Sequence, residues 1–237
     1  MRVVSEPVAL TLPPSVHPRS EGVHLSAIIR CIATENGILK PEWVEELSLV
    51  DVRTITDPVA ILRICIGLAW ESWYIPQLRN VVDHPGELQF DGIYMTPDGE
   101  SVDKIWRQGQ PSFWPFQPKS KRWGHALVLH EVKSTYKSMN TVGFTGQVSR
   151  RGKPLFNPLE SQWMWLAQTK AYCLAMETLY CILHVLFLCG DYSYPIRPQL
   201  HRFYIEFDQL ELDDNWQLMV DYRDYRLSQP LLSDWRG

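Results

Sequence analysis

The stretch that decides the fold is Ala126-Leu127-Val128-Leu129-His130-Glu131-Val132-Lys133. It begins as a short apolar run, rich in residues that favour a buried strand. Successive side chains of a strand point to opposite faces, so Glu131 and Lys133 are predicted to share one face. An acid-x-Lys triplet occurs about once by chance in a chain of this length. The triplet therefore gains weight from its position at the end of a predicted strand.

The second candidate acid is Asp91, which lies in the extended segment Glu87–Met95. This segment is entered through His84-Pro85-Gly86 and left through Thr96-Pro97-Asp98-Gly99, and both stretches are typical of turns. We therefore expect Asp91 to be a strand residue and Asp98 to be a turn residue.

Length and composition predict one globular domain, because 237 residues that are 45% apolar can bury a sizeable core. The five cysteines form no Cys-x-x-Cys pair, so their spacing indicates neither a zinc site nor an iron-sulfur cluster. The chain begins without a basic region followed by an apolar stretch, and it contains no apolar run long enough to span a membrane. We expect a cytoplasmic protein that does not associate with membranes.

Charge is distributed unevenly along the chain, although the net charge is only −4. Residues 104–159 contain ten basic residues and one acid, a net charge of +9, so the rest of the chain is acidic. Local positive charge is what binding to a phosphate backbone requires. Aromatic residues interleaved in this segment either stack on unpaired bases or pack an insertion onto the domain. The residues expected to bind nucleic acid are Lys119, Lys121, Arg122, Lys137, Arg150, Arg151 and Lys153.

Local signals predict the order of secondary-structure elements. Asp57-Pro58 is an N-cap followed by a first-position proline, and Asn157-Pro158-Leu159-Glu160 starts a helix in the same way. Asn36-Gly37 ends an earlier helix. The predicted helices span about 24–35, 41–49, 57–75, 157–178 and 210–226. The predicted strands lie around Val81, Phe90 and Val128, at 179–188 and at 202–207.

This order, with an acid on the second strand and Glu131-Val132-Lys133 on the third, resembles the PD-(D/E)XK nuclease superfamily. Two further groups resemble its RecB-type and lambda-exonuclease-like branch. Gln168-Thr169-Lys170-Ala171-Tyr172 is similar to that branch's Gln-x-x-x-Tyr motif, and Gly67-Leu68-Ala69-Trp70-Glu71 is similar to its helix carrying a Gly and an active-site Glu. The resemblance spans roughly residues 57 to 207 and points to bacteriophage relatives.

The resemblance implies an α/β fold with a restriction-endonuclease-like core, in which helices flank a central mixed sheet of four to five strands. It divides the chain into an N-terminal helical extension, 1–56, and a nuclease core, 57–237. The interval between Asp91 and Glu131 is longer than in compact members, so we expect an insertion at about 98–124 between the second and third core strands. The C-terminal three-cysteine cluster of iron-sulfur members is absent, which argues against such a cluster.

The resemblance also assigns chemistry to the motif residues. Asp91, Glu131 and the carbonyl of Val132 would offer oxygen ligands to Mg²⁺ or Mn²⁺, and Glu71 would help hold a second ion. Lys133 would orient the attacking water and neutralise charge in the transition state. Gln168 and Tyr172 stand at i and i+4 on one helix face and would steady Lys133 or a phosphate. Arg30, with Ser26 one turn earlier, weakly resembles a terminal-phosphate contact.

The implied function is metal-dependent hydrolysis of DNA phosphodiester bonds. The leading hypothesis is an exonuclease that processes DNA ends in recombination, repair or phage DNA metabolism. The second hypothesis is a nicking or structure-specific endonuclease of the same fold. The third is a catalytically silent DNA-binding or virion-associated protein. Implied partners are DNA and either a second copy of the chain or a phage recombination protein, in the bacterial host cytoplasm.

Overall fold

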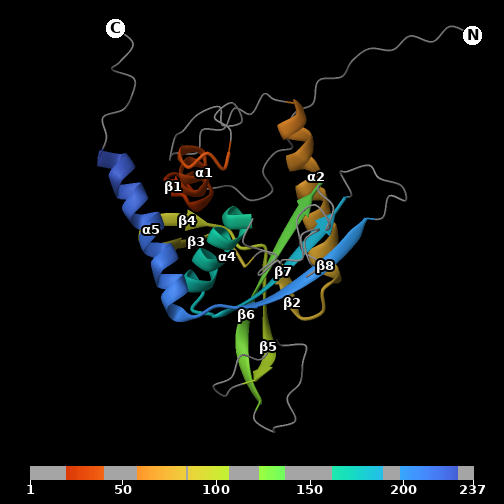
Figure 1. Ribbon diagram of the computed structural model, residues 1–237. Coiled ribbons are helices and arrows are strands. Elements are labelled where there is room, and N and C mark those ends of the chain that lie inside the picture. The colour runs from red at the N-terminus through yellow and green to blue at the C-terminus, as the bar shows by residue number, and fades with distance from the viewer. Residues whose placement is uncertain are drawn as a thin grey trace, which may run out of the picture.

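A computed structural model describes residues 20–39, 58–83, 85–106, 123–136, 162–188 and 198–228 (Figure 1). These residues form a mixed α/β fold with two sheets and four α-helices. The helix predicted at 41–49 lies outside the described residues, and so does the predicted start of the 157–178 helix.

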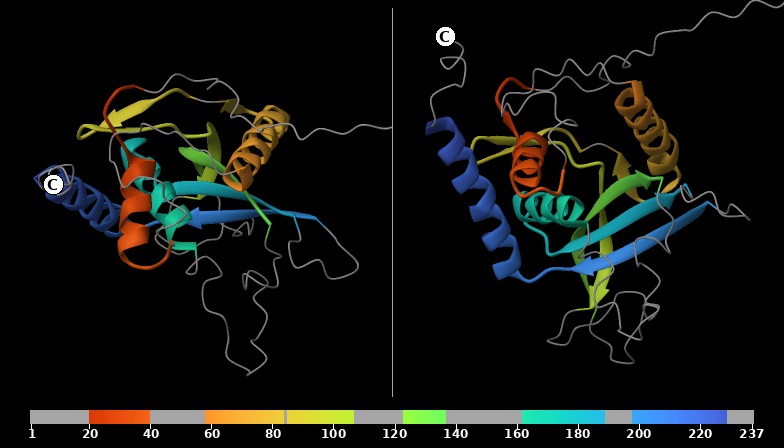
Figure 2. Two further views of the ribbon diagram at one scale, coloured as in Figure 1. Left: turned by 90° about the horizontal axis from the view of Figure 1, so that it is seen from above. Right: turned by 45° about the horizontal axis from the view of Figure 1, so that its top comes forward.

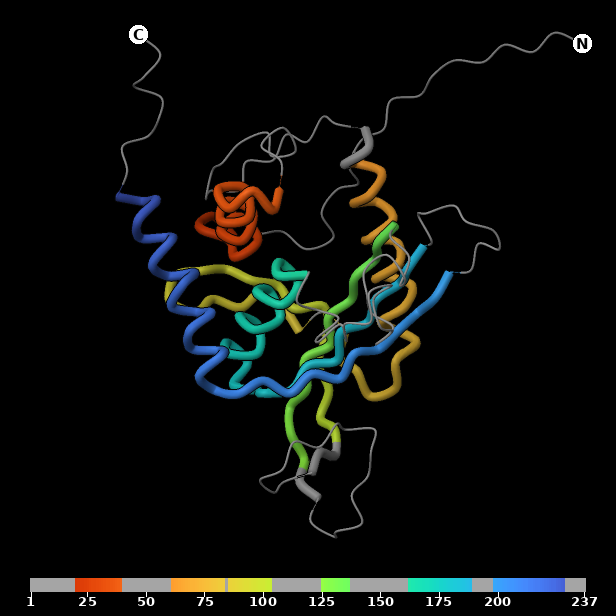
Figure 3. The backbone as a smooth tube through the Cα atoms, viewed as in Figure 1, coloured from red at the N-terminus to blue at the C-terminus, as the bar shows by residue number. Residues whose placement is uncertain are grey.

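The larger sheet has five strands in the order β2-β5-β6-β7-β8. They span Val81–Asp83 (β2), Gly99–Trp106 (β5), Trp123–Thr135 (β6), Tyr180–Phe187 (β7) and Gln199–Glu206 (β8). β2, β5 and β6 pair antiparallel, β6 and β7 pair parallel, and β7 and β8 pair antiparallel. The parallel pair requires a crossover, which runs through helix α4 (Trp163–Ala175), as the path of the chain in Figure 3 shows.

The smaller sheet corrects the prediction of a single strand around Phe90. It has the order β1-β4-β3, from Val23–His24 (β1), Ile93–Met95 (β4) and Leu88–Phe90 (β3). Between β3 and β4 the chain reverses at Asp91 and Gly92, whose φ angles are 47° and 75°. Two consecutive left-handed residues of the Asp-Gly type form the tight turn that matches the twist of a β-hairpin. Asp91 is therefore a turn residue and not the strand residue that was expected.

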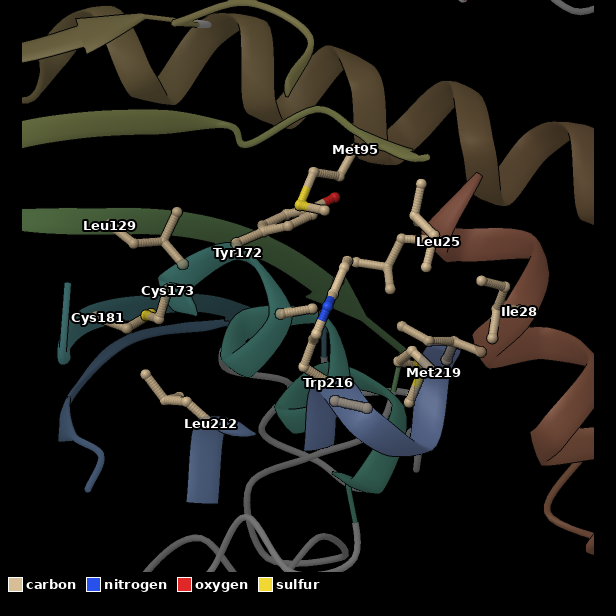
Figure 4. Close-up of a cluster of buried hydrophobic side chains, with 14 of the residues drawn as sticks. Leu25, Ile28, Met95, Leu129, Tyr172, Cys173, Cys181, Leu212, Trp216 and Met219 are labelled. Carbon is tan, nitrogen blue, oxygen red and sulfur yellow. The ribbon is translucent and has the colours of Figure 1, made fainter. Parts of the chain in front are cut away.

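Helices cover both faces of the larger sheet (Figure 2). α1 (Leu25–Glu35), α4 and α5 (Gln209–Ser228) pack with alternate residues of β6 and β7, such as Leu129 and Leu183, in the main core, part of which Figure 4 shows. α2 (Pro58–Tyr74) packs near Val132, whose side chain points to the opposite face. The β6–β7 pair is thus buried on both faces.

Element prediction succeeded where local signals are strong. The helices expected at 24–35, 57–75 and 210–226 and the strands at 179–188 and 202–207 are all present within a few residues. The first bound expected for the insertion is wrong, because Gly99–Trp106 is the strand β5, whereas the second agrees with the start of β6 at Trp123 within two residues. Only residues 107–122 lie between these strands, and they are outside the described residues.

No helix in the described part of the chain combines the length and the apolar character needed to cross a membrane.

Candidate functional site

Glu131 and Lys133 meet on one face of β6, as strand alternation predicts. The Lys133 ammonium donates to Glu131 Oε1 in an ion pair. Glu131 is fully buried, and its second oxygen, Oε2, has no hydrogen-bond partner among the described residues. A buried acceptor without a partner loses its hydration and gains nothing in return, which costs about 1–3 kcal/mol. The carboxylate thus has an oxygen available for a cation.

Asp98 lies beside this pair, just outside β5 as its turn-like context predicts, although it was not among the residues expected at the site. β5 begins at Gly99, which pairs with His130, so from Glu131 onward β6 has no partner residue in β5. Asp98 lies immediately before β5, and its Oδ2 accepts a hydrogen bond of 2.7 Å from the Val132 amide. A side chain thereby replaces the missing ladder partner and is fixed next to Glu131.

Asp91, the acid that the sequence analysis selected, lies elsewhere. Its carboxylate accepts a 2.8 Å hydrogen bond from the Trp216 indole, and its backbone carbonyl accepts one from the Arg223 guanidinium. Both partners belong to α5, so Asp91 ties the β3–β4 turn to that helix. Asp98, and not Asp91, is the acid that the structure brings to Glu131.

Glu71 reaches the same site from α2. Gly67, one turn earlier, faces Ser134 of β6 with 3.9 Å between an ideal Cβ position and the hydroxyl oxygen, so the helix passes close to the end of this strand. The charge of Glu71 interacts with Asp98, Lys133 and Asp83. Glu71 of α2, Asp98 immediately before β5, and Glu131 and Lys133 of β6 therefore interact near the start of β5.

The proximity of these acids shifts their ionisation. Burial raises the pKa of Glu131 to about 8, and the neighbouring Asp98 charge acts in the same direction while Lys133 opposes it. Burial and Asp98 likewise raise the pKa of Glu71 to about 8. Burial alone would lower the pKa of Lys133, but Glu131 and Asp98 together raise it above its ordinary value. Burial and the mutual repulsion of the acids therefore oppose the simultaneous ionisation of Glu71 and Glu131.

The donor set fits a hard divalent cation with few protein ligands. No three His, Cys, Asp or Glu side chains among the described residues are placed to hold a metal ion together. Mg²⁺, however, keeps several waters and is usually held by only one or two carboxylates. Asp98 and the unpartnered oxygen of Glu131 supply such a pair, and the Val132 carbonyl and Glu71 are further oxygen donors nearby. The residues present are compatible with Mg²⁺ or Mn²⁺.

Gln168 and Tyr172 share a face of α4, as their i, i+4 spacing predicts. The Gln168 amide donates a 2.7 Å hydrogen bond to the Tyr172 hydroxyl. Tyr172 is 5% exposed and lies in the main core beside Met95 and Leu129 (Figure 4). The amide is thus oriented by a ring that the core holds in place.

The residues expected to bind nucleic acid are mostly outside the described part of the chain. Of the eight, only Arg30 is described, and its Nε donates to the Ser26 carbonyl one turn earlier on α1, at 3.2 Å. The others are Lys119, Lys121, Arg122, Lys137, Arg150, Arg151 and Lys153.

His130 lies on the opposite face of β6 from Glu131, as strand alternation requires, and makes structural contacts there. It is 4% exposed, and its ring hydrogen-bonds Ser101 Oγ at 2.8 Å and the His184 ring at 3.0 Å. Burial lowers the pKa of His130 to about 4 and that of His184 to about 3, so both rings are neutral. Sequence alone did not reveal the pair, because the strand register that aligns the two residues is a long-range feature.

Comparison with known proteins assigns the chain to no family. No family model matches the sequence, and no curated protein matches it. Among solved structures, one titled "Crystal structure of SSO0001" aligns with 93% of this chain and 84% of its own, at 15% sequence identity and a TM-score of 0.41. Similarity at this level establishes neither a shared family nor a function.

Proposed function

We propose that this protein is a Mg²⁺-dependent deoxyribonuclease with a PD-(D/E)XK active site, built from Asp98, Glu131 and Lys133. The observation that carries the proposal is the convergence of these residues where β5 begins beside β6. Asp98 is fixed by the Val132 amide, and beside it Glu131 presents a buried oxygen that has no hydrogen-bond partner within the described part of the chain. Pro97-Asp98 is then the Pro-Asp part of the motif, and Glu131-Val132-Lys133 is its acid-x-Lys part.

The topology supports the same assignment. When the β3–β4 hairpin is set aside, the order is α2, β2, β5, β6, α4, β7, β8 and α5. This is the order of helices and strands on which the resemblance to the superfamily rests, with β5 in the place that the sequence analysis gave to residues 87–95. In this restriction-endonuclease-like reading, the hairpin is an insertion between the first and second core strands.

Each site residue has a distinct task in phosphodiester hydrolysis. A bound Mg²⁺ supplies an activated water and withdraws charge from the scissile phosphate. Asp98 and Glu131 would hold the ion through hard oxygen atoms, and the Val132 carbonyl and Glu71 would complete the protein side of the site. Lys133 places its positive charge beside the attacked phosphate, where negative charge develops in the transition state. Gln168, held by Tyr172, orients the phosphate or Lys133.

The substrate that we favour is a DNA end. The enzyme would then be an exonuclease that acts in recombination, repair or phage DNA metabolism. This finer assignment depends on the Gln168/Tyr172 and Glu71 motifs, whose resemblance is to an exonuclease-containing branch. An endonuclease of the same fold would use the same residues.

One assay separates the candidate functions. Purified protein is incubated with linear and with covalently closed circular DNA, in Mg²⁺ or in EDTA. Mg²⁺-dependent loss of linear DNA alone supports the exonuclease, whereas cutting of circles indicates the endonuclease. Lack of cleavage of both substrates would refute a nuclease function.

Two lysine variants localise the activity. Lys133→Ala removes the proposed catalytic ammonium, and Lys170→Ala is a matched control because Lys170 pairs with Glu211 on the surface, at 3.2 Å. We expect cleavage to be lost only in Lys133→Ala. Equal activity in both variants would show that the active site is elsewhere.

A further inference from the structure

A chain of hydrogen bonds joins α2 to four strands of the larger sheet. The Tyr74 hydroxyl, in the last residue of α2, lies 3.0 Å from His184 Nδ1 on β7 and accepts a 3.2 Å hydrogen bond from Arg202 Nε on β8. His184 Nε2 lies 3.0 Å from His130 Nδ1 on β6. His130 Nε2 in turn lies 2.8 Å from Ser101 Oγ on β5.

Arg202 donates to the Tyr74 oxygen, because a guanidinium only donates. One arrangement that satisfies every group has the Tyr74 hydroxyl donating to His184 Nδ1, His184 Nε2 donating to His130 Nδ1 and His130 Nε2 donating to Ser101. Every ring nitrogen in the chain is satisfied, which buried polar groups require.

Tyr74 is also one of the few buried side chains of α2. Between Ile61 and Tyr74, only these two residues are buried, whereas Leu62, Leu68 and Trp73 are each more than 40% exposed. The C-terminal end of the helix is held by Tyr74 and Ile75, which pack on Val132. The Tyr74 ring also stacks on Trp70, with centroids 4.7 Å apart.

Glu71 lies one helical turn before Tyr74, between the stacked Trp70 and this anchor. A helix with so little buried surface can shift along or rotate over the sheet unless its end is fixed. Such a shift would move the Glu71 carboxylate relative to Asp98 and Glu131, which are fixed to β5 and β6. The anchor therefore bears directly on the geometry of the site.

We propose that Tyr74 is a positioning residue, which through its hydrogen bond to His184 holds the Glu71 carboxylate at the metal site. This inference rests on the proposed nuclease function. Tyr74 acts on the metal only through Glu71, so its removal should weaken metal binding in a chain that retains Glu71 and should have no further effect in one that lacks it.

The test uses Tyr74→Phe, which keeps the ring stacked on Trp70 and removes only the hydroxyl. Mn²⁺ affinity is measured by calorimetry, and the Mg²⁺ concentration for half-maximal DNA cleavage is measured in parallel. We expect the Mn²⁺ affinity to fall about tenfold and the Mg²⁺ concentration for half-maximal cleavage to rise about tenfold. This is the effect of losing a group that orients a metal ligand. In the Glu71→Gln background, Tyr74→Phe should change neither quantity.

Tyr222→Phe is the matched control, because its hydroxyl donates to Glu35 between α5 and α1 at 2.6 Å. It should lower stability without changing metal affinity. His184→Asn breaks the same anchor from the sheet side and should reproduce the effect of Tyr74→Phe, even if one of the two variants folds poorly.

The outcomes distinguish the inference from the proposed function. Mg²⁺-dependent cleavage by the wild-type chain, together with unchanged metal affinity in Tyr74→Phe, would overturn the positioning role alone. Equal losses from Tyr74→Phe with and without Glu71 would also overturn it, because Tyr74 would then be a general stabilising residue. A wild-type chain that neither binds Mn²⁺ nor cleaves DNA would overturn both.

Discussion

Asp98→Asn separates the contribution of Asp98 to catalysis from its contribution to stability. The carboxylate accepts a hydrogen bond from the Val132 amide at 2.7 Å. An asparagine oxygen can accept the same bond, so the substitution removes negative charge and keeps the local structure. We expect the free energy of unfolding to change by less than about 1 kcal/mol, whereas Asp98→Ala leaves the amide unpaired and should cost about 1–3 kcal/mol.

Cleavage should respond quite differently from stability. Loss of the charged metal ligand proposed at Asp98 should lower the cleavage rate by at least about 100-fold in both variants, which corresponds to about 2.7 kcal/mol of transition-state stabilisation. The assay compares initial rates on linear DNA at saturating Mg²⁺ with denaturant unfolding of the same preparations.

Asp91→Asn is the matched control for this experiment. The substitution also removes one carboxylate charge, but in the turn that contacts Trp216 of α5. Its cleavage rate should stay within about twofold of wild type, because no transition-state contact is removed. Loss of cleavage in Asp91→Asn, with cleavage retained in Asp98→Asn, would refute the assignment of the metal-binding acid.

Three further predictions concern stability. In metal-free buffer the free energy of unfolding should fall as pH rises from about 4.5 to about 8 and level off above that. Burial raises the pKa values of Glu71 and Glu131 from 4.5 to about 8, so in this range the folded chain keeps two protons that the unfolded chain has lost. Denaturant titrations at several pH values test this, and a slope that is unchanged in Glu131→Gln would contradict it. Gly99→Ala should cost about 1–3 kcal/mol, because its Cβ would lie 2.9 Å from Val81 Cγ1; a loss below about 0.5 kcal/mol in denaturant unfolding would be inconsistent with this packing. Trp216→Phe should lower the free energy of unfolding by at least about 1.5 kcal/mol, because it removes the indole hydrogen bond to the β3–β4 turn, and it should leave cleavage unchanged. Reduced cleavage in a folded variant would instead link α5 to catalysis.

The sequence predicted the helices well because their signals are local. Pro58 opens α2 and Asn36-Gly37 closes α1 where expected, with Gly37 at a φ of 68°. Each signal acts within a few residues of the helix end, so no knowledge of the rest of the fold is needed.

The site was predicted only in part because one of its acids is fixed by long-range pairing. The positions of Glu131 and Lys133 follow from strand alternation, which needs only the identity of β6. The place of Asp98 depends on the pairing of Gly99 with His130, which local patterns do not specify. The segment around Asp91 alternates like a strand, but its Asp-Gly pair forms a hairpin turn and moves the acid away from the site. The sequence did contain a signal for this acid, because Pro97-Asp98 directly precedes a strand. The signal was missed because Thr96-Pro97-Asp98-Gly99 has the composition of a turn.

The claim most open to direct measurement is that Asp98 and Glu131 hold a divalent cation together. Calorimetric titration of Mn²⁺ into the wild-type chain, Asp98→Asn and Glu131→Gln tests it without relying on catalysis. We predict one saturable site in the wild-type chain and at least about tenfold weaker binding in both variants. Equal affinity in all three proteins would contradict the metal site.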